Sequence, residues 1–189
     1  MNRLVAALVS ATLVAPLAAA AHTPGRLEPN SPFDVPDPKV SYAMYGELFT
    51  GEEVFRIRLS LDERFALPVE IFVPHAAKLR EHRPAYAVVA KGLPAPSAEE
   101  LAALPRPLPA GWGAIVELNQ VSPRPVFFES FLRRFYWTSG AIAIALPAGE
   151  VEIWIWAPVK SKGKFGLGFG VEEGGGYGAA LKDWSFYAY

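Results

Sequence analysis

The sequence predicts an all-β fold, an antiparallel β-sandwich of jelly-roll type with about eight strands and one or two short helices. Three observations lead to this prediction. Short apolar or alternating segments recur along the chain, and turns rich in glycine and proline separate them, with 16 Gly and 18 Pro among the 189 residues. Only two brief stretches have helical character. No repeat of fixed period indicates a solenoid or a propeller.

The N-terminal residues predict export. Residues 1–21 carry Arg3, an apolar run from Leu4 to Val14 and then small residues, which is the layout of a secretory signal peptide. Cleavage after Ala20 and cleavage after Ala21 both fit, and a retained N-terminal anchor is the alternative. We expect a secreted, periplasmic or cell-surface protein. No transmembrane span is expected after signal cleavage, because no later apolar run is long enough to cross a bilayer.

Residues 22–41 predict a proline-rich arm, since five prolines fall between His22 and Lys39 with little hydrophobic periodicity. Such an arm either packs along the domain surface or acts as a flexible spacer. Residues 42–189 then form the β-sandwich domain. Its aromatic-rich C-terminal end is expected to close a sheet as an edge strand.

Strands are expected wherever apolar residues alternate or form short runs. The clearest is the stretch from Glu53 to Leu61, where the apolar residues at odd positions from 55 to 61 point inward and the arginines point outward. The other expected strands are Tyr42–Phe49, Leu67–Val73, Ala85–Ala90, Gly113–Asn119 and Ala141–Leu146. The stretch from Val126 to Tyr136 is ambiguous between helix and strand. Residues 75–83 predict a short helix, and Ser97 with Glu100 predicts a capped helical turn in the long connection that follows Gly92.

A hairpin is expected between residues 150 and 172. Val151, Ile153 and Ile155 share one face of its first strand, and Trp154 and Trp156 share the other. Gly166, Gly168 and Gly170 alternate with apolar residues on its second strand. If a three-residue loop ending at Gly163 joins the strands, Trp154 faces Gly170 and Trp156 faces Gly168.

The order of motifs resembles that of a group of uncharacterised secreted or membrane-anchored proteins, and their ends resemble the bacterial pre-peptidase C-terminal type of β-sandwich. The motifs are YGEL, EEVFRIRLSL, IFVP, RPAYAVVAKGLP, LPAGWGAIV, FFESFLRRFYW, LPAGEVEIWIW and GKFGLGFGVEE. This chain has Glu53, Val54 and Phe55 where such modules usually carry a pair of aspartates. The resemblance implies an accessory, non-catalytic module and brings no catalytic residues with it.

Composition narrows the possible partners. Cysteine is absent, which excludes disulfides and thiol chemistry. The formal net charge is -1 with no basic stripe, and this argues against nucleic acid as a partner. A protein or a glycan at the cell surface is the kind of partner we expect for an interaction or accessory module.

Two candidate ligand sites follow from the residues. Trp154 and Trp156 could form a flat platform on which sugar rings stack, with Trp112 and Trp137 extending it, as in a carbohydrate-binding module. The alternative is that the indoles cover a central strand, because both faces of that strand are apolar. His22, as a mature N-terminal residue, could chelate copper through its amine and its imidazole with a second histidine, while His75 and His82 otherwise predict a solvated helix face.

No catalytic constellation is recognised, so we do not expect an enzyme. Glu117 and Glu129 lie on separate apolar strands and could form a buried carboxylate pair of the kind that glycosidases use. The alternative is that each carboxylate faces solvent or pairs with Arg133 or Arg134. The two alternatives differ in whether the structure brings the two glutamates together.

Overall fold

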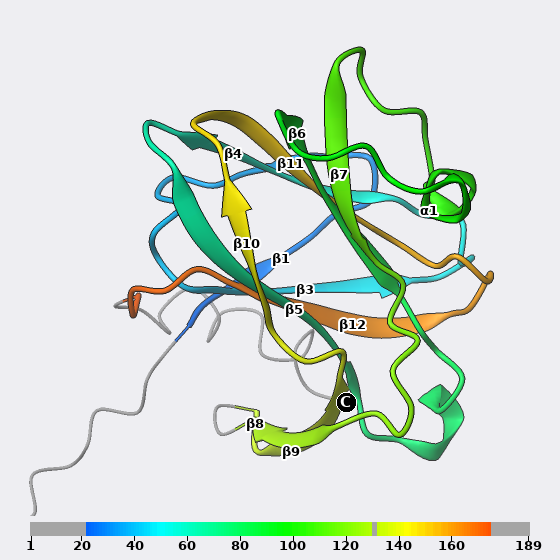
Figure 1. Ribbon diagram of the computed structural model, residues 1–189. Helices are drawn as coiled ribbons and strands as arrows, with labels where there is room; N and C mark the ends of the chain where they lie inside the picture. The colour runs from blue at the N-terminus through cyan, green and yellow to red at the C-terminus, as the bar shows by residue number, and fades with distance from the viewer. Residues whose placement is uncertain (1–21, 130–131, 175–189) are drawn as a thin grey trace, which may run out of the picture.

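The computed structural model describes residues 22–129 and 132–174 and shows a β-sandwich of two mixed sheets (Figure 1). The predicted signal peptide at residues 1–21 and the predicted edge strand in residues 175–189 lie outside the described residues. Within the described part of the chain, no helix has the length and apolar character needed to cross a membrane.

The strands divide into a seven-strand sheet and a five-strand sheet. The seven-strand sheet contains, in spatial order, β1 (Thr23–Arg26), β3 (Tyr42–Leu48), β12 (Gly163–Phe169), β5 (Phe65–Pro74), β9 (Arg134–Thr138) and β8 (Val126–Glu129), with β10 (Ile142–Leu146) also paired to β5. The five-strand sheet contains β2 (Phe33–Asp34), β4 (Phe55–Leu61), β11 (Gly149–Trp156), β6 (Ala85–Lys91) and β7 (Trp112–Glu117). The expected strands from Tyr42 to Ala90, and those at residues 113–119 and 141–146, are all present within a few residues of their predicted ends.

The core lies between the two sheets and follows from alternation along each strand. On β4, Phe55, Ile57 and Leu59 are at most 1% exposed, and the residues between them face outward. Phe165, Leu167 and Phe169 do the same on β12 from the opposite sheet. Each such side chain contributes roughly 1.5–3 kcal/mol of burial free energy. The alternation in the sequence therefore predicts correctly which faces of these strands meet.

The proline-rich arm packs along the sandwich, which is one of the two alternatives stated for it. It supplies β1, which pairs in parallel with β3, and β2, which pairs in parallel with β4. Leu27 between them is buried in the main core. The arm thus adds an edge strand to each of the two sheets.

The predicted hairpin between residues 150 and 172 is wrong. β11 pairs with β4 and β6 in the five-strand sheet, while β12 pairs with β3 and β5 in the seven-strand sheet. The segment 157–162 therefore crosses from one sheet to the other. A strand that is apolar on both faces needs a cover on each face, but its own sequence does not select its neighbours, which here are the distant strands β4 and β6.

A roof of loop residues covers the outer face of the five-strand sheet. The connection from β6 to β7 carries α1 (Ala98–Ala103), and Ser97 with Glu100 forms the predicted capping box at its start. Figure 1 shows this connection standing beside β7, outside the sheet. Leu104 and Leu108 from the connection pack against the buried cluster that contains Trp154 and Trp156 of β11 and Ala85 and Ala87 of β6. These contacts give β11 the second apolar cover that its sequence requires.

Two short segments differ from their predictions. Residues 75–83 contain only a single 3-10 turn, η1 (Ala77–Leu79), and His82 is 3% exposed, so the solvated helix face predicted for the two histidines is wrong at His82. The ambiguous stretch from Val126 to Tyr136 forms neither one helix nor one strand. It contains β8 and most of β9, which pair with each other in antiparallel fashion.

Candidate functional site

The four tryptophans predicted for a platform do not form one on the surface. Trp154 is 1% exposed and Trp156 is 4% exposed, because both lie under the loop roof with Trp112 packed against them. The Nε1 of Trp154 donates to Glu152 at 2.5 Å, and the Arg106 guanidinium carbon lies 5.3 Å from the centroid of its indole. The indoles therefore cover a central strand, which is the alternative stated for them above.

Trp137 lies apart from the other three, on β9 of the opposite sheet. Its indole contacts His75, at 4.3 Å between ring centroids, and the Arg124 guanidinium carbon lies 4.4 Å from the indole centroid. Arg124 also donates to the carbonyl oxygens of Arg80 and His82 and so holds the segment around η1 in place. These contacts give Trp137 a packing role at one end of the sandwich.

The copper hypothesis needs a second imidazole beside His22, and the structure does not provide one. The Nδ1 of His22 lies 2.6 Å from the hydroxyl oxygen of Ser41. His75 packs on Trp137, and the Nδ1 of buried His82 lies 2.9 Å from the hydroxyl oxygen of Ser161. In residues 22–129 and 132–174, no group of three or more His, Cys, Asp and Glu could hold a metal ion.

The glutamate pair considered for hydrolysis is also not assembled. Glu117 is on β7 and accepts a hydrogen bond from the backbone N–H of Asn119 at 2.6 Å. Glu129 is on β8 of the other sheet and accepts from the backbone N–H of Leu132. The structure therefore does not bring together the two carboxylates that this reaction would use.

The outer face of the seven-strand sheet has a feature that the sequence interpretation missed. Gly166 and Gly168 share this face of β12, and their neighbours on β5 in register are Phe72 and Glu70. A Cβ at Gly166 would lie 2.1 Å from a ring atom of Phe72, so the Phe72 ring lies directly over Gly166. The sequence predicts indoles opposite Gly168 and Gly170, whereas the structure places a phenyl ring of the neighbouring strand over Gly166.

Gly168 has no such cover. A Cβ at Gly168 would meet nothing closer than Glu70 Cγ at 3.5 Å, which is ordinary van der Waals contact, and its φ is not positive. Every other glycine in the described residues either has a positive φ or would bring its Cβ within 2.5 Å of another atom. A glycine inside a strand weakens it and often marks a place where a ligand approaches the backbone closely. Gly168 is therefore the described glycine that neither backbone conformation nor packing explains.

A hollow of about 240 Å³ opens above this position, and we call it the Gly168 hollow. Three strands of the sheet and the β8 edge contribute to it, together with the start of the arm. It is lined by His22, Ala43, Tyr45, Glu70, Phe72, Phe127, Phe128, Glu129 and Gly168. The floor of the hollow carries only small residues, Ala43 and Gly168, which are partners in register on β3 and β12.

Aromatic rings form one wall of the hollow. Phe72 lies at the centre of this group, with edge-on contacts to Tyr45 and Phe127 at centroid distances of 5.8 Å and 5.6 Å. Tyr136 stacks on Phe127 from the next strand, at 5.8 Å. Burial and the nearby carboxylate of Glu129 raise the pKa of Tyr136 above its ordinary value. The aromatic wall is thus a packed, low-polarity surface with carboxylates at its margin.

A hydrogen bond from a neighbouring residue orients Glu70, one of the polar groups that line the hollow. Glu70 Oε2 accepts a hydrogen bond from the hydroxyl of Thr138 at 2.8 Å, and the same hydroxyl oxygen accepts from the backbone N–H of Gly140 at 2.9 Å. A carboxylate has about four acceptor positions, so this bond orients Glu70 and leaves capacity for a ligand. Phe128 at the edge of the hollow is 52% exposed. The arrangement can bind a small group between a flat floor, an aromatic wall and a positioned carboxylate.

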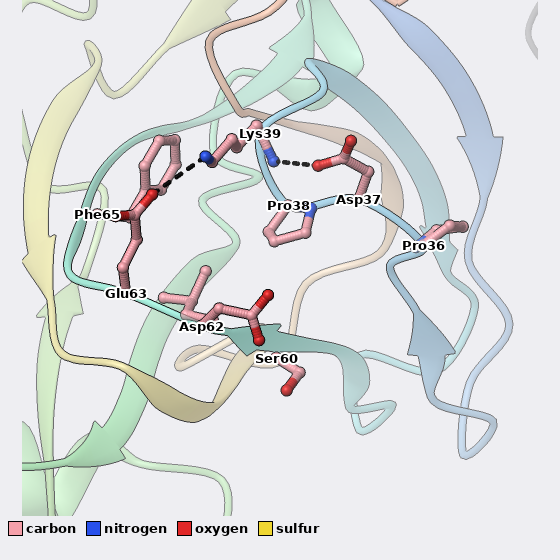
Figure 2. A pocket seen from close by; sticks show the side chains of 9 residues that line it. Pro36, Asp37, Pro38, Lys39, Ser60, Asp62, Glu63 and Phe65 are labelled. Atoms are coloured by element: carbon pink, nitrogen blue, oxygen red, sulfur yellow. Dashed lines mark hydrogen bonds and ion pairs between the residues drawn. The ribbon is translucent and has the colours of Figure 1, made fainter.

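A second hollow, of about 430 Å³, lies between residues 36–39 and the turn from β4 to β5. Figure 2 shows the Lys39 side chain directed to Glu63, at 3.2 Å, while the Lys39 backbone N–H donates to Asp37 at 3.0 Å. Glu63 raises the pKa of the Lys39 ammonium group through this ion pair. The charged groups of this second hollow are exposed and already bind one another. We therefore assign no ligand to it, although it is larger than the Gly168 hollow.

Sequence reasoning missed the Gly168 hollow because its residues come from segments far apart in the chain. One signal was present, since Glu70 and Phe72 alternate with the buried residues of β5 and must face outward. Phe72 is nevertheless buried on that outward face. An aromatic residue at an outward position next to an unexplained glycine is the pattern that could have pointed to the hollow.

Comparisons with known proteins give a likeness in structure. No protein-family model matches the sequence, and no curated protein matches it. The structure is similar to the crystal structure of the pre-peptidase C-terminal domain of collagenase from Bacillus anthracis, with 8% sequence identity and a TM-score of 0.41, over 75% of this chain and 97% of that chain. This is the kind of domain that the sequence motifs resemble. At this identity and TM-score, no residue role is taken from it.

Proposed function

We propose that this protein is an exported, non-catalytic accessory module that binds a small group of its partner in the Gly168 hollow. Export is supported by the signal-like layout of residues 1–21. A non-catalytic role is supported by the separation of the carboxylates and imidazoles considered for chemistry.

The observation that carries this proposal is the bare backbone at Gly168. The fold itself would accept a side chain there, and strand stability would gain from one. A glycine at this position keeps the floor of a hollow open between aromatic rings and a positioned carboxylate. Its volume of about 240 Å³ is below the range of roughly 300–1,000 Å³ that suits drug-sized ligands. The hollow therefore suits one ring or one side chain.

A fragment screen followed by backbone amide NMR tests the proposal. We expect fragments of one ring or one short chain to shift the amide signals of Gly168, Ala43 and Glu70 in a saturable way. Gly168→Val should remove these shifts while the rest of the spectrum stays folded, because its methyl groups would fill the floor. Gly168→Ala is the graded control. Fragments that gather at Lys39 and Glu63 in the second hollow, or at no common place, would overturn the proposal.

A further inference from the structure

We propose that the group bound in the Gly168 hollow is an alkylammonium group, such as a lysine side chain or a free amine presents. This inference rests on the proposed function and adds the chemical class of the ligand. It follows from the charges around the hollow, from its wall and from its size.

The charges favour a cation. The described residues that line the hollow include the carboxylates Glu70 and Glu129, and none of them is lysine or arginine. Arg134 is the partner of Glu129 in register across β8 and β9, so it lies beside that carboxylate. Glu70 instead faces the glycine floor and is oriented by a hydroxyl group. Glu70 is therefore the carboxylate to which we assign the ammonium group.

The wall and floor favour a cation on an apolar stem. Aromatic rings attract an ammonium group through their negative faces, and they also pack against methylene groups. Ala43 and Gly168 present an apolar floor, which lowers the screening of the charge at Glu70. An alkylammonium group places its stem on the floor and wall and its charge at the carboxylate. A neutral sugar ring would use the hydrogen-bond acceptors but would leave the charge of Glu70 without a partner.

Basic residues also lie near this part of the sheet, because Arg26 is in register with Tyr45 and Arg134 is in register with Glu129. Lys164 is on β12 two positions before Gly166 and is in register with Glu47 on β3. Burial lowers the pKa of Lys164, the carboxylate of Glu47 raises it, and the positive charges of Arg134, Lys78 and Arg26 lower it by smaller amounts. Arg26 forms an ion pair with Glu28 at 2.7 Å. Glu47 and Glu129 face Lys164 and Arg134 in register, whereas Glu70 faces Gly168. Glu70 is therefore the carboxylate that attracts an incoming ammonium group.

Titration with matched probes tests this inference on the purified protein. The probes are n-butylammonium, the neutral alcohol n-pentanol, which is one methylene group longer, methyl glucoside, and a peptide with blocked ends and a single lysine. We expect n-butylammonium to bind at least tenfold more tightly than n-pentanol and methyl glucoside, with amide shifts at Gly168 and Ala43. Tighter binding of the peptide than of n-butylammonium identifies a protein side chain as the source, and the reverse identifies a free amine.

Two variants separate the possible failures. Glu70→Gln keeps an acceptor for Thr138 and removes the charge, so it should lower the affinity for n-butylammonium at least tenfold and leave n-pentanol unchanged. Glu63→Gln, in the other hollow, is the matched control and should change neither. If n-pentanol or methyl glucoside binds at Gly168 as tightly as n-butylammonium, the cation inference fails and the binding site stands. If no probe shifts Gly168, the inference and the proposed function fail together.

Discussion

Gly168 and Gly166 stand two residues apart on the same strand face, and the absence of a side chain has a different cause at each. Phe72 occupies the space above Gly166, so the packing of the sheet requires that glycine. Gly168 has room for a methyl group, so the fold does not require it. A residue that costs stability without a packing reason is where function is expected.

Alanine at these two positions should therefore have opposite effects. Gly168→Ala should raise the free energy of unfolding by about 0.5–1 kcal/mol, because a strand interior favours alanine over glycine by that amount. Gly166→Ala should lower it by roughly 1–3 kcal/mol, because its Cβ would overlap the Phe72 ring. Urea unfolding of the two variants measures both values. A loss of stability in Gly168→Ala equal to that in Gly166→Ala would contradict our account of the hollow.

His82 makes stability depend on pH. Burial, together with the charge of Arg124, lowers the pKa of His82 from 6.5 to about 4. In the part of the chain that the structure describes, its Nε2 has no hydrogen-bond partner. The folded state therefore favours the neutral form of the His82 imidazole. The stability that it contributes is complete above pH 6.5 and is lost as the pH falls from 6.5 toward 4.

This loss should amount to roughly 3 kcal/mol across that pH range. His82→Gln removes the titrating group, so its unfolding free energy should change less between pH 7 and pH 4 than that of the natural chain. His75→Gln, at an exposed position, should keep the natural pH dependence. Equal slopes in His82→Gln and the natural chain would show that His82 is not the group responsible.

At the scale of elements, β11 shows what alternation can and cannot predict. The sequence predicts that Val151, Ile153 and Ile155 share one face and that Trp154 and Trp156 share the other, and the structure confirms both faces. It does not predict that β4 and β6 are the neighbours of β11, because pairing depends on which distant segments present complementary edges. The nearest strand along the chain, β12, enters the opposite sheet.

Trp154 should act as a stabilising residue rather than as a binding residue. Trp154→Ala should lower the free energy of unfolding by roughly 3–5 kcal/mol, the usual cost of removing a large buried aromatic side chain. Trp154→Phe should cost clearly less, because it keeps a ring under the roof. Denaturant unfolding gives both values, and acrylamide should quench the emission of Trp154 poorly. Ready quenching of Trp154, with little loss of stability in Trp154→Ala, would show that the roof is open.

At the scale of the whole molecule, the N-terminal arm joins the two sheets along their edges. β1 extends the seven-strand sheet and β2 extends the five-strand sheet, with buried Leu27 between them. The composition of residues 22–41 left open whether the arm packs or remains a spacer, since proline suits both an edge and a linker. The pairing with β3 and β4 depends on edges that form only when both sheets are assembled.

A chain that lacks residues 22–34 should be less stable by at least about 2 kcal/mol, since the burial of Leu27 alone contributes roughly 1.5–3 kcal/mol. It should also associate more readily, because β3 and β4 would become open edges. Thermal unfolding and size-exclusion chromatography measure the two effects. An unchanged melting temperature would mean that the arm is a spacer after all.

The Gly168 hollow exists only at this largest scale, because β3, β5, β8, β12 and the start of the arm meet there. Alternation along single strands predicts the core faces, and it cannot predict that Ala43 and Gly168 lie opposite each other. The most direct test of ammonium binding at Glu70 is a structure of a crystal of the protein soaked with n-butylammonium. We expect the alkyl chain to lie over Gly168 and its nitrogen to lie within hydrogen-bond distance of Glu70. An unoccupied hollow at a saturating concentration, or the probe bound elsewhere, would contradict this expectation.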